Sequence, residues 1–127
     1  MYRKDVKKCS GKKINLCVID ENTIHFDFDD SALSLELIGD CCSICNFEDY
    51  NVKELNEMIF VDVSYELDYE NSSRSSEDVC DYYIDTYIMS VIYKQSQQTE
   101  EMQCELRFSH SHNGYYSCWI QSKLDPI

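Results

Sequence analysis

Apolar and polar residues alternate over much of this chain, as they do in β-strands with one face in a core and the other in water. The clearest run is 61–70, where we expect one face to be buried, namely Val61, Val63, Tyr65, Leu67 and Tyr69. Alternation over 23–29 and 33–37, with a tight turn at Asp30-Ser31 between them, predicts a hairpin. Further strands are expected over 14–19, 40–47 (a strand or a bend) and 86–94.

The C-terminal segment 102–122 contains the strongest turn signal. Asn113-Gly114 suits a type I′ turn, because both central residues of that turn need a positive φ. The flanking runs are therefore predicted to pair with each other as a hairpin. A two-residue turn places Phe108 opposite Trp119 on the core face, and it puts Cys104 and Cys118 on opposite faces.

A single short segment, 51–58, has helical spacing, with Asn51 as N-cap and Glu54 three residues later. The polar segment 71–78 is expected to be a mobile loop. Together these elements predict an α+β fold, mainly an antiparallel β meander of about eight short strands with one short helix. We expect a single β-rich domain over 14–127, preceded by a basic N-terminal extension over 1–13.

Charge changes the picture of the surface. The chain has 24 acidic and 11 basic side chains, a formal net charge of −13. Six of the basic residues lie within the first 13 positions: Arg3, Lys4, Lys7, Lys8, Lys12 and Lys13. Because so acidic a body repels phosphate, we expect a protein partner with a basic surface and no direct nucleic-acid binding, except through the basic N-terminal stretch. We expect no membrane, because no run approaches the ~18 apolar residues that a membrane span needs. The alternative is that the charge serves solubility alone.

The outward positions of 61–70 form the predicted partner site. Carboxylates two residues apart lie on one side of a strand, and their mutual repulsion is relieved when a basic partner binds. The alternative is an ordinary solvated strand face. Tyr115 and Tyr116 are successive, so one of them must face away from the core and can contact a partner. The predicted binding residues are Asp62, Glu66, Asp68, Glu70, Tyr115 and Tyr116.

Eight cysteines raise the question of metal or redox chemistry. The basic N-terminus has no apolar stretch typical of a secretory signal, so we expect a cytoplasmic protein (cytosol or nucleus) with free thiols. Cys41-Cys42-x-x-Cys45 could bind zinc with two more ligands. The candidates are scattered: Cys17, Cys80, Cys104, Cys118, His110 and His112. Because no second C-x-x-C pair exists, we expect no metal and no cofactor.

Enzyme signatures are also missing. There is no Gly-rich phosphate loop, nucleophile elbow or metalloprotease helix in the sequence. A Cys104–His110 nucleophile pair is excluded, because six residues of extended strand span about 20 Å. We therefore expect no catalytic residues and no enzyme activity.

Two short motifs resemble a known family. The DCC segment at 40–42 and HNGYYS at 112–117, together with the order of elements, are similar to an uncharacterised family of small proteins from tailed phages and other large DNA viruses. The resemblance covers about residues 10–122. This chain has Asp30-Ser31 where the family has Asp-Gly, and it lacks the family's histidine shortly before DCC. The resemblance implies a fold and a viral origin, and it implies no activity.

These observations predict a non-enzymatic, acidic viral accessory protein that binds a basic host or viral macromolecule. Its sharpest version is an inhibitor that mimics the charge of nucleic acid. One alternative is a structural or assembly component of the virion, which would place the protein in the particle. The second alternative is a small-ligand or zinc-binding domain.

Overall fold

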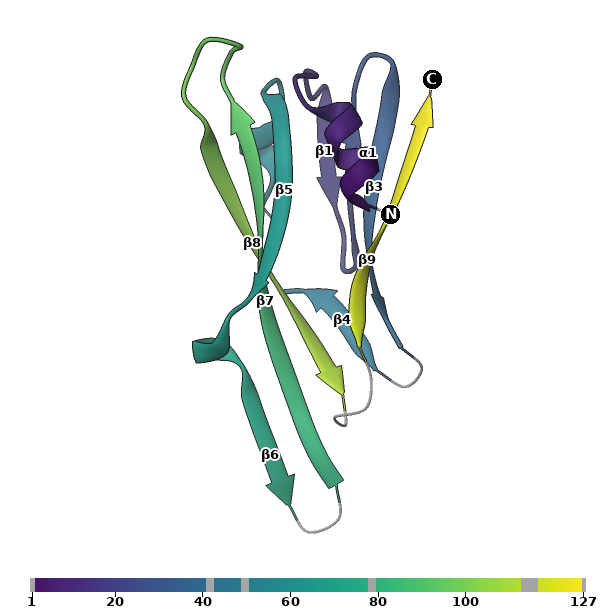
Figure 1. The fold of residues 1–127 in the computed structure, drawn as a ribbon, viewed down its shortest axis with the longest axis vertical. Coiled ribbons are helices and arrows are strands. Elements are labelled where there is room, and N and C mark those ends of the chain that lie inside the picture. Colours follow the sequence, from purple (N-terminus) through teal and green to yellow (C-terminus); the bar gives the residue numbers. More distant parts are fainter. Residues whose placement is uncertain (1, 41–42, 49–50, 78–79, 113–116, 127) are drawn as a thin grey trace.

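Alternating burial along the strands builds a sandwich of two antiparallel sheets, with one α-helix at an open side (Figure 1). The computed structural model describes residues 2–40, 43–48, 51–77, 80–112 and 117–126. The predicted α+β, mainly antiparallel class is confirmed, with nine strands among the described residues against the eight expected.

The four-stranded sheet contains the expected hairpin at 23–39. Its strand order is β1-β2-β3-β9, and Phe26 of β2 lies opposite Leu33 of β3. The apolar positions at Ile24, Leu35 and Leu37 are buried with them, as the alternation predicts. The strands are β1 (Leu16–Ile19), β2 (Thr23–Asp27), β3 (Ser31–Gly39) and β9 (Cys118–Pro126).

The five-stranded sheet is organised around the 15-residue strand β7. Its order is β4-β8-β7-β5, and β6 also pairs with β7 beyond the end of β5. The prediction of a mobile loop at 71–78 is wrong, because 73–77 forms strand β6. This strand pairs with β7, and the two strands project past the four-stranded sheet (Figure 1). The strands are β4 (Ile44–Phe47), β5 (Ile59–Leu67), β6 (Ser73–Glu77), β7 (Cys80–Lys94) and β8 (Met102–His112).

The predicted C-terminal hairpin is wrong. β8 pairs with β4 and β7, whereas β9 pairs with β3 in the other sheet. Trp119 therefore lies opposite Ile38, not Phe108, and 42% of its surface is exposed. The turn signal at Asn113-Gly114 concerns only a few residues and does not determine which strands pair. These two residues lie outside the described part of the chain. Each strand instead gains a long ladder elsewhere, since β9 alone forms nine residue pairs with β3.

The helix is also in a different place. The 51–58 segment forms only one 3₁₀ turn, η1 (Lys53–Leu55), and Glu57 follows with a φ of 70°. The α-helix is α1 (Tyr2–Cys9), in the basic N-terminal segment. Val6 and Cys9, three residues apart, share one face and are fully buried. None of the helices in the described residues has both the length and the apolar character that a membrane crossing needs.

Helix α1 closes the sandwich between β5 and β9 (Figure 1). Arg3 donates from Nη1 to Asp62 Oδ1 at 2.8 Å and to the Val63 carbonyl at 2.7 Å, both on β5. On the opposite side, the Ser122 hydroxyl of β9 donates to the Asp5 carboxylate. The basic segment is thus tied to both sheets.

A disulfide also joins the sheets, which corrects the expectation that all cysteines are thiols. Cys45 of β4 is bonded to Cys118 of β9, with their Cα atoms 6.7 Å apart. The two residues are 73 positions apart in sequence and come together only because β8 and β9 separate. Cys9, Cys17 and Cys104 are buried free thiols.

We predict that the double variant Cys45→Ser/Cys118→Ser loses about 2–4 kcal/mol of unfolding free energy, because the bridge restricts the unfolded chain. Denaturant titration without reductant measures this loss. Reductant should lower the stability of the wild type similarly and leave the double variant unchanged. A wild type that does not respond to reductant contradicts the bridge.

Candidate binding face of the five-stranded sheet

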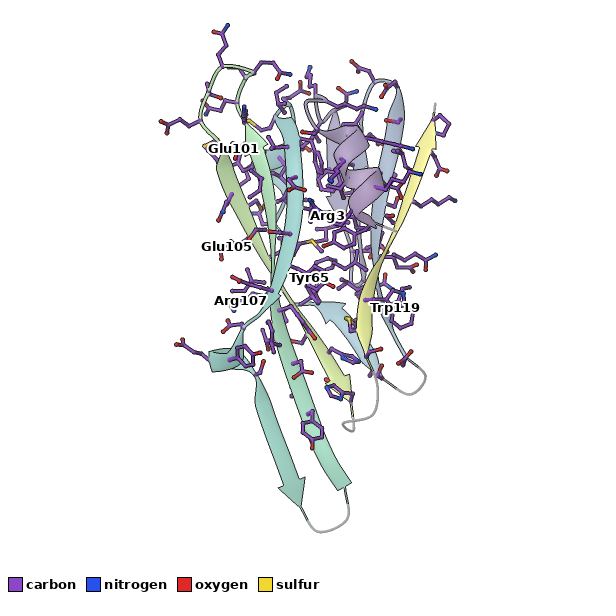
Figure 2. All side chains as sticks on the ribbon, viewed as in Figure 1. Arg3, Tyr65, Glu101, Glu105, Arg107 and Trp119 are labelled. Atoms are coloured by element: carbon purple, nitrogen blue, oxygen red, sulfur yellow. A yellow bond between two sulfur atoms is a disulfide. The ribbon has the colours of Figure 1, made fainter. Side chains whose placement is uncertain are left out.

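The outward surface of β8 follows directly from its alternation. Cys104, Leu106 and Phe108 fill the core, so the residues between them point to solvent. Figure 2 shows Glu101, Glu105 and Arg107 on the side of this sheet that faces away from the other sheet.

A hollow of about 320 Å³ lies on this outer face. The strand register creates it, because Ser64, Ser90 and Glu105 lie side by side on β5, β7 and β8. The two serines are small and leave space between larger neighbours. The lining residues are Ser64, Tyr65, Glu66, Ile88, Ser90, Gln103 and Glu105.

The electrostatics of the hollow are set by Glu66 and Glu105, which flank β7 from opposite sides. Neither carboxylate forms an ion pair with any residue in the described ranges. The nearby cation Arg107 is already paired with Asp68 at 2.6 Å, and this hydrogen bond raises the pKa of the guanidinium. Lys94 shares the outer face by alternation, farther along β7.

The predicted carboxylate row is not continuous. Asp62 turns towards Arg3 at the irregularity between Phe60 and Asp62, and Asp68 is held by Arg107. Glu70 lies beyond the strand, in the 3₁₀ turn η2 (Tyr69–Asn71). Only Glu66 of the four lines the hollow. Tyr115 and Tyr116 lie outside the described residues.

The inward side of the 61–70 run also differs from expectation. Tyr65 packs its ring against Tyr87 and Phe108, yet 36% of its surface is exposed at the sheet edge. Tyr69 is 80% exposed, because the strand has ended at Leu67. The alternation therefore predicted the strand but placed its end at residue 70, three residues after Leu67, where the strand ends.

Glu105 and Gln103 were missed as site residues. Their own alternation marks them as outward, but only the strand order shows that β8 and β5 both border β7. No local signal in the sequence brings residues 66 and 105 to one hollow.

Among the described cysteine and histidine candidates, Cys104, His110 and His112 are buried on the inner face of this sheet. Cys118 is in the disulfide, and burial, with Glu54 nearby, raises the pKa of the Cys104 thiol to about 12. An activated nucleophilic cysteine needs the opposite shift. Of the zinc candidates, His110 and His112 come together with Asp85 at the other end of β8, whereas Cys41 and Cys42 lie outside the described residues.

No family model, curated protein or solved structure matches this chain. The outer face is therefore interpreted from its own geometry and charge.

We predict that Cys104 resists alkylation in the folded protein near neutral pH, because its thiol is buried and protonated. Peptide mass spectrometry after brief iodoacetamide treatment measures the labelling. The same treatment in denaturant should label Cys104 fully and serves as the control. Fast labelling of the native protein would refute the assignment of a buried, inactive thiol.

Proposed function

We propose that this chain is a non-enzymatic accessory protein that binds a basic protein through the outer face of its five-stranded sheet. The observation that carries the proposal is the pair Glu66 and Glu105, which share one hollow without a cationic partner among the described residues. Two like charges in one hollow repel each other, and a bound cation removes that cost.

The chemistry of the hollow favours a lysine or arginine side chain. Carboxylates form charge-assisted hydrogen bonds with both groups, and arginine adds a planar, two-pronged geometry. The hydroxyls of Ser64 and Ser90 and the amide of Gln103 offer further acceptors around the two carboxylates. Arg107 forms its ion pair with Asp68, and its charge also interacts with Glu105 without a direct ion pair.

The charge of the whole chain supports the same partner class. A net charge of −13 attracts a basic protein over long range and accelerates the encounter. A protein that handles DNA or RNA presents such a basic surface, so competition for its nucleic-acid site is the sharpest form of the proposal. The DCC and NGYYS resemblance supports a viral setting for it.

We place the protein in the cytosol or nucleus of the infected cell. Three buried cysteines, Cys9, Cys17 and Cys104, are unpaired thiols, and reducing compartments maintain thiols. The Cys45–Cys118 bridge is the exception to this pattern. Thiol trapping at the moment of lysis measures its state in the cell.

We predict that Glu66→Gln/Glu105→Gln weakens the binding of a lysine-rich peptide about fivefold at low salt. The variant loses two exposed ion pairs to the peptide, and each contributes about 0.5 kcal/mol of binding free energy. Fluorescence anisotropy over a salt series measures the affinity. The matched control is Glu21→Gln/Glu36→Gln, which removes the same formal charge from a loop and from β3 of the other sheet. Its affinity should stay close to that of the wild type.

Equal losses in the two double variants would show that net charge alone attracts the peptide and would refute the outer face as the site. Affinity capture with both double variants then extends the test to natural partners. A basic protein that is retained by the control variant and lost with Glu66→Gln/Glu105→Gln, and that is released by high salt, is the expected result.

A further inference from the structure

Three potential metal ligands meet at the inner face of the five-stranded sheet, near the end of β8. Asp85 of β7 lies directly opposite His110 of β8, and His112 follows two residues later on the same face. Their ligand atoms all lie within 4.8 Å of one another. This cluster is on the opposite side of the sheet from the hollow with Glu66 and Glu105.

The cluster is enclosed. His110 is 1% exposed and His112 is 9% exposed. The two imidazole rings stack with their centroids 4.6 Å apart. The ring of Tyr83 also stacks on His112, with a centroid distance of 5.3 Å. His112 Nε2 is 2.7 Å from Asp85 Oδ2, so a carboxylate already fixes the orientation of one ring.

The other ring has an unexplained atom. Nε2 of His110 is buried and has no hydrogen-bond partner among the described residues. A buried polar atom without a partner costs about 1–3 kcal/mol, so proteins normally satisfy such atoms. The unpartnered nitrogen of His110 therefore lies beside two further potential ligands and has no protein group to bind among the described residues.

We propose that Asp85, His110 and His112 bind a divalent transition metal of the zinc class. Two imidazoles and one carboxylate are a donor set for zinc and its neighbours in the first transition row, and not for magnesium or calcium. Ligands of a tetrahedral zinc lie about 3.4 Å apart, so the side chains, whose ligand atoms lie within 4.8 Å of one another, must rotate to converge on the ion. The ion displaces the proton of the His112–Asp85 hydrogen bond, which is released to solvent, and it also binds the unpartnered Nε2 of His110.

Among the described residues, no cysteine sulfur contributes to the cluster. Cys45 lies opposite His110 on β4, but its sulfur is bonded to Cys118. The donors that the described residues offer are therefore nitrogen and oxygen, and these three ligands leave a fourth position of a tetrahedral ion to another ligand. This site differs from the one that the C-x-x-C spacing suggested, because only the β7–β8 register brings Asp85 to the two histidines.

The test uses the full chain, without a polyhistidine tag and without reductant. Calorimetric titration with ZnCl₂ gives the affinity and stoichiometry, and CoCl₂ gives a visible spectrum that reports the ligands. We expect one ion per chain, a higher Tm with metal, and a cobalt spectrum without thiolate charge-transfer bands. His110→Gln and His112→Gln should each weaken zinc binding at least about 100-fold, since even outer-shell losses cost about 10–100-fold.

His25→Gln is the matched control, because His25 is also 2.7 Å from an aspartate, Asp27, but has no second imidazole beside it. It should bind zinc like the wild type. Asp85→Asn provides a further ligand variant if a histidine variant does not fold, as judged by circular dichroism without metal. The proposal is overturned if the wild type binds no zinc, if the folded ligand variants retain wild-type affinity, or if cobalt shows thiolate ligation.

Discussion

The contact of Phe60 with Phe26 and Phe28 is the interaction on which the rest of the structure depends. Phe60 of β5 packs edge-on against both rings, with centroids 5.1 and 5.7 Å away. These fully or almost fully buried rings join the two sheets and fix their inner faces. Once the inner faces are fixed, the two-residue period assigns the remaining side chains, so Glu105 must face solvent while His110 faces the core.

Local alternation was enough to predict the class of the fold and the β2–β3 hairpin, because both depend on neighbouring residues. It was not enough to predict the partners of β8 and β9. A turn signal at Asn113-Gly114 describes a few residues, whereas the choice of partner depends on the whole ladder that each strand can form. The sequence did not predict helix α1 for a related reason. Val6 and Cys9 are two apolar residues among lysines, and they define a buried helical face only when the helix packs on the core of the sandwich.

The candidate site could be predicted only in part for the same physical reason. Glu66 was expected to face outward, and it does. Asp62 and Asp68 were expected beside it, but arginines 59 and 39 residues away pair with them. Such long-range pairs have no signature in a strand's own sequence. These pairs neutralise Asp62 and Asp68, and of the predicted carboxylates they leave Glu66 in the hollow with Glu105, neither in an ion pair within the described ranges.

Strand β8 therefore presents different chemistry on its two faces, and burying polar side chains on the inner face costs more free energy than exposing them on the outer face. A sandwich core normally excludes polar side chains, yet the end of β8 buries two imidazoles beside a carboxylate. The strands β7 and β8 extend past β5 at this end, because the β5–β7 ladder stops at Leu67 and Tyr87 whereas the β7–β8 ladder continues to Tyr83 and His112. The Cys45–Cys118 bridge holds the two sheets together there instead. With covalent closure in place, this end of the core can accommodate polar groups that hydrophobic packing alone would not tolerate.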